Sequence, residues 1–375
     1  MRRILAVHPS DELYGADRIM LEAASVLGRR GPVTVWLPDD VDYPDRPLTR
    51  RLADAGVRAS RQPTPVLRRA SVRPAALPAL LRRMWRTWRA IGREDAGLVY
   101  LSTSAVLPVA PLAKLRGARV VLHLHESWSR LDRLLLTPLL WWCDEVVAVS
   151  VAAAHTLPTK RKVTVVHNGI ELSPRLDARQ RVEVRSRVGA GEGDVVVVVA
   201  SRWNAWKGHE TLLAAWHGLA RRDAHLVILG GAPVAGRGVD VEALVAAGAR
   251  RDSVHVVGEL EDVHEWFEAA DVVAMPSTGP EPFGLVALEA SALGTAVFAS
   301  RTGGLPEIVV DGQTGRLLEP GDVAAWRAAL EEAVVSELAT LGKSARLRYE
   351  ERFTGARFAR AFAQSLAPQP ERKVS

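Results

Sequence analysis

The chain has 375 residues, of which 48% are hydrophobic and 25% charged, and these proportions are typical of soluble globular proteins. This length exceeds what one hydrophobic core usually supports, so two domains are expected. The 49 Lys and Arg residues against 43 Asp and Glu give a mild net charge of +6. The single Cys143 excludes an intrachain disulfide framework and a cysteine zinc site, and it fits a reducing cytosol.

No segment of the sequence is typical of secretion or of a membrane span. The apolar stretch at the N-terminus ends quickly at Asp11 and Glu12, and it is too short for a signal peptide. No apolar run approaches the roughly 20 residues that cross a bilayer. The sequence therefore predicts a cytoplasmic protein that at most lies on the inner face of the cell membrane.

Short β-like runs alternate with helical stretches along the whole chain. This alternation predicts α/β domains, each with a parallel sheet between two layers of helices. After a first strand at 4–8 we expect a loop at 9–15 and a helix at 16–29. Further strands of the first half are expected at 33–37, 98–101, 120–123, 146–149 and 163–166.

The turn-forming Asn168-Gly169 interrupts this pattern, and a polar segment follows at 173–193. We therefore expect the first domain to end at 172 and the second to cover 173–350. Two α/β halves with ligand sites at the carboxyl edges of their sheets imply a cleft between them. A basic helix at 344–366 and a disordered tail from 368 onward end the chain. In the second domain we expect strands at 195–200, 225–229, 254–257, 272–275 and 295–299, and helices at 210–219, 241–247, 263–270, 285–293 and 323–334.

The stretch from Glu281 to Glu289 has one carboxylate beside prolines and another inside a helix-forming run. A helix that begins near Phe283 would present free amides at Phe283, Gly284 and Leu285, and such an end attracts phosphate. If the whole span were helical, the carboxylates would lie about 12 Å apart. That is too far for the ~5–9.5 Å pair of a glycoside hydrolase, but it suits the two ends of one elongated anion. An ordinary capped helix is the alternative.

Two cations follow the strand expected at 195–200. Arg202 and Lys207 lie in the loop before the next helix, and a planar guanidinium and a point-charged ammonium both suit a diphosphate. A solvated basic loop is the alternative. Gly303-Gly304 begins another turn after a strand, where backbone amides could face a ligand.

Candidates in the first half carry weaker signals. Gly15 permits close backbone approach beside the first strand, although a simple strand–helix turn explains it equally well. His123 and His125 share one face at the end of a strand, but no other ligand cluster accompanies them, so a lone functional histidine is favoured over a metal site. Asp40-Val41-Asp42 matches a metal-binding pattern of some transferases, and we interpret it as solvated surface.

The segment 67–93 holds eight arginines and no acidic residue. Its apolar residues recur at helical spacing, so it could be a basic amphipathic helix that docks on anionic lipid. It could equally be a surface helix that packs its tryptophans on the first sheet. No recognised motif supports a nucleic-acid role.

The second half resembles glycosyltransferase family 4, the retaining enzymes of the two-domain GT-B fold that are also called glycosyl transferases group 1. The order and spacing of four motifs carry this resemblance: Arg202…Lys207-Gly208, Met275-Pro276-Ser277, Glu281…Glu289 and the glycine turn that runs from Gly303 to Gly315. The first half is similar only through Gly15, His125-Glu126 and the connector Val166-His167-Asn168-Gly169. Its first loop has fewer glycines than the family often shows.

The resemblance implies roles for the matching residues. Arg202 and Lys207 would neutralise the pyrophosphate of a nucleotide-sugar donor, Glu281 would accept hydrogen bonds from the transferred sugar, and Glu289 would bind the ribose. His125 would act with Arg202, Lys207 and Glu281 as catalytic residues, and a last helix at 351–367 would cross back onto the first domain. The implied donor-binding set is Gly15, Arg202, Lys207, Gly258, Leu260, Glu281, Phe283, Gly284, Leu285 and Glu289.

The implied activity is retaining, metal-independent transfer of a hexose from a UDP-, GDP- or dTDP-sugar to a hydroxyl of a glycan, lipid-linked or small-molecule acceptor. No cofactor or metal is expected, and the nucleotide sugar is a co-substrate. An epimerase or hydrolase on the same fold, and a non-catalytic sugar-nucleotide or membrane-binding protein, are the alternatives. The sequence leaves the sugar, the base, the acceptor and the oligomeric state open.

Overall fold

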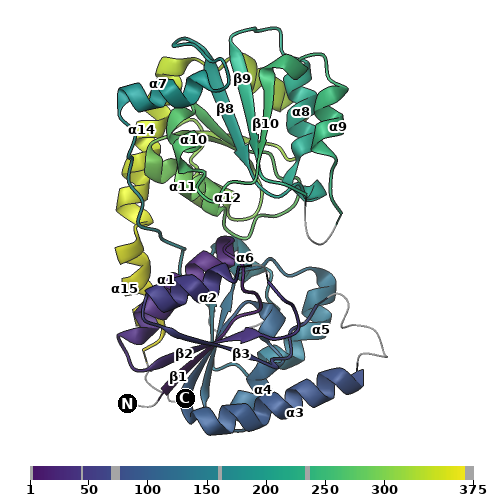
Figure 1. The fold of residues 1–375 in the computed structure, drawn as a ribbon, viewed down its shortest axis with the longest axis vertical. Coiled ribbons are helices and arrows are strands. Elements are labelled where there is room, and N and C mark those ends of the chain that lie inside the picture. The colour runs from purple at the N-terminus through teal and green to yellow at the C-terminus, as the bar shows by residue number, and fades with distance from the viewer. Residues whose placement is uncertain (1–2, 44, 69–76, 159–162, 233–236, 368–375) are drawn as a thin grey trace, which may run out of the picture. The chain divides into compact units, whose positions relative to one another are not determined.

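The computed structural model describes residues 3–43, 45–68, 77–158, 163–232 and 237–367. The chain forms two compact units (Figure 1). Unit 1 comprises Met1–Gly169 and Gly355–Ser375, and unit 2 comprises Ile170–Thr354. The sequence placed these borders after 172 and after 350. The tail predicted to be disordered, 368–375, lies outside the described residues.

Unit 1 is built on a parallel sheet that has seven strands among the described residues, in the order β3-β2-β1-β4-β5-β6-β7. The chain order reverses between β1 and β4, whose register pairs Ile4 with Leu98. The central strands are apolar runs buried on both faces, as a helix-covered parallel sheet requires. The strands are β1 (Arg3–Val7), β2 (Val33–Pro38), β3 (Arg58–Gln62), β4 (Ala96–Ser102), β5 (Arg119–Leu124), β6 (Glu145–Ala148) and β7 (Val163–Val165).

Helices cover both faces of this sheet. α1 packs on α2 and on α15, whereas α4 packs on α3 and on α5. Right-handed crossovers explain why the helices lie on two faces of the sheet. The chain first runs from β1 outward to β3 and then returns to β4 on the other side of β1, so the direction of the crossovers reverses and the later helices cover the opposite face. The helices are α1 (Gly15–Gly28), α2 (Pro47–Asp54), α3 (Leu77–Glu94), α4 (Val109–Lys114), α5 (Arg130–Leu140), α6 (Val151–His155) and α15 (Gly355–Ser365).

Unit 2 repeats the architecture with a parallel sheet of six strands in its described residues, ordered β10-β9-β8-β11-β12-β13. Together the two sheets confirm the predicted fold class. The strands are β8 (Val195–Ala200), β9 (Ala224–Leu229), β10 (Val254–Gly258), β11 (Val272–Met275), β12 (Ala296–Ser300) and β13 (Gly315–Leu318). The helices are α7 (Ala178–Ser186), α8 (His209–His217), α9 (Val241–Ala246), α10 (His264–Ala269), α11 (Leu285–Leu293), α12 (Leu305–Ile308), α13 (Val323–Glu331) and α14 (Val335–Arg352).

Several elements differ from the sequence-based expectation, among them two strands and one helix. The strands β3 and β13 were not predicted, because both lie at a sheet edge and their sequences, Arg-Ala-Ser-Arg-Gln and Gly-Arg-Leu-Leu, lack a long apolar run. The single helix predicted at 344–366 was wrong. It is two helices, α14 and α15, separated at Phe353–Thr354, where the buried Phe353 leaves the helical conformation and Gly355 follows.

The sheet order fixes where a ligand can lie in each unit. In doubly wound sheets, ligands bind at the carboxyl ends of the two strands between which the chain order reverses. These strands are β1 and β4 in unit 1, and β8 and β11 in unit 2. None of the helices that the structure describes is long and apolar enough to cross a membrane.

Candidate functional site

The loops after β8 and β11 meet at the carboxyl edge of the unit 2 sheet. Nζ of Lys207, in the first loop, lies 2.6 Å from Oε1 of Glu281, in the second. The hydroxyl of Ser277 donates to the same oxygen at 2.7 Å. The structure thus brings together two of the residues that the sequence singled out separately, at the point where strand order reverses.

The Glu281 carboxylate is almost fully buried, with a side chain that is 6% exposed. A buried carboxylate needs a partner, since the desolvation of an unpaired charge costs several kcal/mol. Lys207 and Ser277 supply that partnership through Oε1 alone, and no hydrogen bond joins Oε2 to another described residue. Nζ of Lys207 also lies 4.2 Å from the centre of the Trp206 ring. The pair therefore holds a fixed ammonium beside a carboxylate oxygen that can still accept hydrogen bonds.

Two glycines let the neighbouring loops approach this pair. A Cβ on Gly208, whose φ is +78°, would lie 1.8 Å from the carbonyl oxygen of Pro276. A Cβ on Gly303, whose φ is +55°, would lie 2.0 Å from the carbonyl oxygen of Glu281. The amide of Gly304 donates to that same carbonyl at 2.8 Å. The loop after β12, predicted as a ligand-facing turn, is thus part of the scaffold that holds Glu281.

The helix predicted at 285–293 is confirmed with these bounds, so it does not begin near Phe283 as the phosphate-binding argument supposed. α11 starts at Leu285, with Gly284 as its N-cap at φ +109° and no side-chain cap. Because residues 281–284 are not helical, the all-helical spacing of about 12 Å between the two carboxylates does not apply. The side chain of Phe283 is buried and contacts the ring of Phe353 edge-on at 6.2 Å. Phe283 can therefore offer a ligand its backbone only, and the free amides belong to the turn after Gly284.

The remaining predicted donor residues lie along the same edge. Arg202 lies two residues after the end of β8 and is half-buried. Glu289 lies on α11 and is buried, with Oε2 3.5 Å from Nε2 of His264. Gly258 ends β10 with φ +91°, and its carbonyl accepts from the amide of Gly230 at 2.7 Å. Leu260 is exposed in the loop that follows.

The predicted residues of unit 1 lie at the carboxyl edge of its own sheet. Gly15 opens α1, and His125 follows β5 with its ring 4.1 Å from that of His123. Burial, with smaller contributions from His123 and His8, holds the pKa of His125 well below its usual range. Its Nε2 is buried without a hydrogen-bond partner among the described residues. Burial therefore favours the neutral form of the His125 imidazole.

The side-chain partners around these sites were not predicted. Ser277 belongs to the motif Met275-Pro276-Ser277 that carries the resemblance, but the sequence assigned it no role. In unit 1, Nε2 of His8 lies 2.7 Å from Oδ1 of Asp17, and the Tyr100 hydroxyl lies 2.7 Å from Nδ1 of His123. Burial lowers the pKa of His123 to about 3. Only the proximity of residues distant in sequence reveals these pairs.

The aspartates predicted as solvated surface form ion pairs with arginines. Asp40 bonds Arg68 at 2.8 Å, and Asp42 lies 3.3 Å from Arg61. Burial tends to raise the pKa of Asp40, but Arg68 outweighs it, so the pKa is lowered. Across the described ranges, no three His, Cys, Asp or Glu side chains are grouped as a metal site would require.

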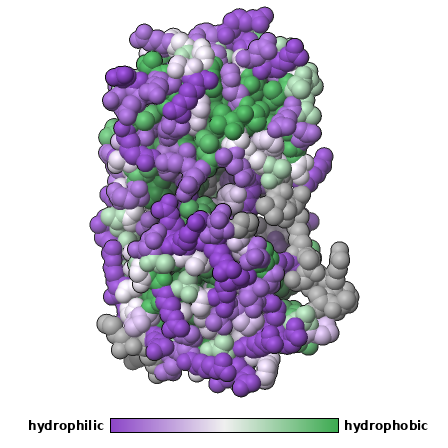
Figure 2. Space-filling view, viewed as in Figure 1, coloured by the Kyte–Doolittle hydropathy of each residue, from purple (hydrophilic) through white to green (hydrophobic). Residues whose placement is uncertain are grey.

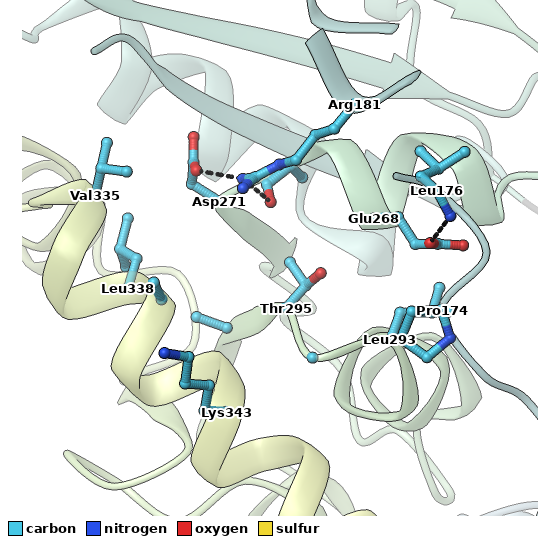
Figure 3. A pocket seen from close by; sticks show the side chains of 14 residues that line it. Pro174, Leu176, Arg181, Glu268, Asp271, Leu293, Thr295, Val335, Leu338 and Lys343 are labelled. Atoms are coloured by element: carbon cyan, nitrogen blue, oxygen red, sulfur yellow. Dashed lines mark hydrogen bonds and ion pairs between the residues drawn. The ribbon is translucent and has the colours of Figure 1, made fainter. Parts of the chain in front are cut away.

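A cavity of about 270 Å³ lies elsewhere in unit 2, near the amino ends of β11 and β12 (Figure 3). Leu293 and Leu338 are among its apolar lining residues, and Arg181, Asp271 and Lys343 are among its charged ones. Arg181 and Asp271 are paired with each other at 2.8 Å. This cavity is at the sheet edge opposite to Lys207 and Glu281, and it is separate from the candidate site.

Two family profiles match this chain. "Glycosyltransferase Family 4" matches residues 14–174, and "Glycosyl transferases group 1" matches residues 193–335. The second match lies within unit 2 and contains Arg202, Lys207, Glu281 and Glu289.

Curated relatives include proteins named D-inositol 3-phosphate glycosyltransferase. That of Xylanimonas cellulosilytica is 37% identical over 207 residues, which are 52% of this chain and 48% of the relative. That of Streptomyces avermitilis is 35% identical over 190 residues, which are 48% of this chain and 40% of the relative. The chain thus spans about half the length, or less, of these curated relatives.

Solved structures share the fold. HepE of Anabaena, in complex with UDP and glucose, is 21% identical with a TM-score of 0.81, covering 98% of this chain and 99% of that one. Sucrose-phosphate synthase of Thermosynechococcus elongatus is 21% identical with a TM-score of 0.77, covering 97% and 98%. At this identity the likeness shows the architecture, two Rossmann-like parallel-sheet domains.

Proposed function

We propose that this chain, which belongs to the glycosyltransferases of family 4, moves a hexose from a nucleotide-diphosphate sugar to a hydroxyl group, with retention of configuration and without a metal ion. One observation carries the proposal: the Lys207–Glu281 pair at the carboxyl edge of the unit 2 sheet, where β8 and β11 end. A nucleotide sugar needs a cation for its diphosphate and an acceptor of hydrogen bonds for its sugar, and this pair offers both.

The diphosphate would bind between the loop after β8 and the start of α11. Arg202 and Lys207 lie on that loop, and the first amides of α11 add the partial positive charge of a helix N-terminus. Together they would neutralise the negative charge of the diphosphate, which a divalent cation neutralises in other transferases. This is why we propose that no metal is required.

The sugar and the ribose would bind to the two buried glutamates. Oε1 of Glu281 is held by Lys207 and Ser277, so its Oε2 can accept from a sugar hydroxyl. Glu289 would accept from the ribose hydroxyls, and the backbone near Gly258 and Leu260 would border the base. The roles of Gly15 and His125 rest on the family resemblance and stay predictions.

Catalysis would be largely electrostatic. As the bond from the anomeric carbon to the phosphate oxygen breaks, negative charge grows on the diphosphate and the sugar gains oxocarbenium character. Fixed cations stabilise that charge without having to reorganise. The acceptor oxygen would attack the same face of the sugar, and a phosphate oxygen of the departing nucleotide would take its proton. Neither glutamate is proposed as a general acid or base.

The proposal names the donor class and leaves the sugar to experiment. HepE was solved with UDP and glucose, and the curated relatives are named for inositol 3-phosphate. We therefore propose a UDP-, GDP- or dTDP-sugar as donor, and a glycan, a lipid-linked sugar or a small-molecule hydroxyl as acceptor. Such products belong to polysaccharide or glycoconjugate biosynthesis.

Product analysis tests this proposal. A ligand that binds only the folded protein raises its melting temperature, so a thermal-shift screen of UDP-, GDP- and dTDP-sugars first identifies the donor. We expect that donor to glycosylate an acceptor in EDTA and to give the same anomeric configuration, read by NMR. Turnover of the donor without any acceptor would instead indicate an epimerase or hydrolase. Donor binding with no turnover across acceptors would indicate a non-catalytic protein.

We also propose that unit 1 contacts an anionic membrane surface. The sequence left open whether the tryptophans of α3 pack on the sheet, and the structure leaves both exposed, Trp85 by 54% and Trp88 by 36%. Arg89 lies over Trp85 at 4.9 Å and Arg116 over Trp88 at 3.7 Å. Tryptophan beside arginine is typical of membrane interfaces.

The helix α5 adds a second exposed apolar stripe to unit 1. Leu134 on this helix is 74% exposed and Trp141 just after it is 65% exposed. Such large exposed apolar side chains contrast with the face of the molecule seen in Figure 2, where hydrophilic side chains predominate. Large apolar side chains recur along one side of this helix and just past its end, and contiguous exposed apolar surface marks an interaction site. They are Leu131, Leu134, Leu135, Trp141 and Trp142.

Vesicle flotation tests the membrane contact. We expect the wild-type protein to float with vesicles that contain phosphatidylglycerol and to remain unbound with phosphatidylcholine alone, because each arginine near an anionic surface contributes about 1 kcal/mol. Neutralising Arg82, Arg86 and Arg89 by glutamine should abolish flotation. Neutralising three exposed arginines of unit 2, Arg222, Arg251 and Arg327, is the matched control. A wild-type protein that never floats would show that no membrane contact is made.

A further inference from the structure

The carboxylate of Glu289 has a histidine as its neighbour on α10. Nε2 of His264 lies 3.5 Å from Oε2 of Glu289, whose side chain is 7% exposed. This nitrogen is buried and has no hydrogen-bond partner among the described residues. Hydrogen bonds between nitrogen and oxygen are usually 2.7–3.2 Å long, so a shift of a few tenths of an ångström would join the two groups.

The other side of the His264 ring is held firmly. Nδ1 lies 2.9 Å from Oδ1 of Asp262, and the backbone amide of His264 donates to the same oxygen at 2.9 Å. Oδ2 of Asp262 accepts from Arg175 at 2.9 Å. Burial tends to raise the pKa of Asp262, but the hydrogen bonds from His264 and Arg175 outweigh it and lower the pKa. The ring of Phe267 packs edge-on against the His264 ring, with 6.2 Å between the two ring centres.

This arrangement forms a chain of contacts from Arg175 through Asp262 and His264 to Glu289. A carboxylate can only accept a hydrogen bond, so the His264 nitrogen that bonds Glu289 must be the donor, and bonds to Glu289 and Asp262 together require both ring nitrogens to carry a proton. We infer that His264 is a positioning residue, which orients the Glu289 carboxylate for the hydroxyls of the donor's ribose. The inference rests on the proposed function, in which Glu289 binds the ribose.

The alternative is that His264 serves only the structure of α10, which it begins. Two substitutions separate these roles. The amide nitrogen of asparagine reaches about as far as Nδ1 of histidine, so His264→Asn keeps the contact with Asp262 and removes the one with Glu289. The amide nitrogen of glutamine reaches about as far as Nε2, so His264→Gln keeps a donor for Glu289 and removes the one for Asp262.

The experiment measures the dissociation constants of UDP and 2′-deoxy-UDP by calorimetry, or of GDP and 2′-deoxy-GDP if only GDP stabilises the wild-type protein. We expect the wild type to prefer the ribonucleotide, because a site built to bond a hydroxyl rejects the analogue that lacks it. His264→Asn should reduce this preference by about five- to tenfold, as the loss of one oriented hydrogen bond predicts. His264→Gln should keep most of it.

The readouts separate the inference from the proposed function. Glu289→Gln should reduce the preference for the ribonucleotide over its 2′-deoxy analogue. A wild type without this preference, or a Glu289→Gln protein that keeps it in full, would refute the ribose role of Glu289 itself. If Glu289→Gln behaves as expected but both His264 variants keep the preference, or both lose it equally, the positioning role is wrong while the proposed function stands. His155→Asn, at an exposed histidine of unit 1, and melting curves of every variant serve as controls. In steady state, His264→Asn should raise the donor KM and leave kcat nearly unchanged.

Discussion

Replacing Lys207 by alanine is expected to lower kcat by about 10²- to 10³-fold, the loss measured when one fixed donor to a developing negative charge is removed. Nζ of Lys207 lies beside Glu281 at the strand ends where the diphosphate is proposed to bind. Its charge would be most valuable as the sugar–phosphate bond breaks, because only then does negative charge grow on the diphosphate. The effect should therefore appear in kcat as well as in the donor KM.

The same substitution also leaves the buried Glu281 carboxylate with Ser277 as its one remaining side-chain partner among the described residues. Such a loss is destabilising because the charge is no longer compensated. The double variant Lys207→Ala/Glu281→Gln removes both charges, so it should regain most of the melting temperature and none of the activity. A recovered melting temperature would assign the loss of stability in Lys207→Ala to the uncompensated charge of Glu281.

Steady-state kinetics and thermal melts of the two variants measure this prediction. Lys343→Ala removes an exposed lysine on α14 of the same unit, and it should match the wild type in both measurements. A Lys207→Ala protein that is folded and fully active with its donor would refute the assignment of the diphosphate to this cation.

The sequence was informative where burial dictates the residue type. The central strands β8 and β11 are uninterrupted runs of valine and other apolar residues, buried on both faces, and their bounds were predicted as observed. The edge strands β3 and β13 were not predicted. A strand at a sheet edge needs fewer apolar residues than a central strand, and both of these strands contain arginine. The break between α14 and α15 was not predicted. Phe353 is buried although it lies outside a helix, and the hydrophobic periodicity of the sequence cannot distinguish such a residue from one on the buried face of a continuous helix.

The same distinction holds for the candidate site. Arg202 and Lys207 were found because they follow a predicted strand, and Glu281 because it precedes the predicted N-terminal end of a helix. The bonds that orient them could not be found in this way. Ser277 and His264 matter through the side chains they face, and the strand β11 and the loop after it separate His264 from Glu289 in the sequence. Such pairs become visible only when the packing of α10 against α11 is known.

Replacing Gly303 by alanine is the second change expected to have a large effect. An added Cβ would lie 2.0 Å from the carbonyl oxygen of Glu281 and 2.6 Å from its amide nitrogen. Both atoms belong to the backbone, so no side chain can turn away, and the loop that carries Glu281 must move. Displacing a catalytic group by about 1 Å can cost about 100-fold in rate, and we expect at least that loss in kcat/KM.

Gly312→Ala is the control that separates the close contact at Gly303 from backbone strain alone. Gly312 has φ +70°, close to the +55° of Gly303, but a Cβ there would meet nothing within 4 Å. Alanine at Gly312 should therefore cost about 1–2 kcal/mol for its left-handed conformation and leave kcat/KM nearly unchanged. Urea unfolding and donor kinetics of both variants measure the difference. If the two variants lost activity equally, the close contact between the Gly303 turn and Glu281 would have no part in holding the site.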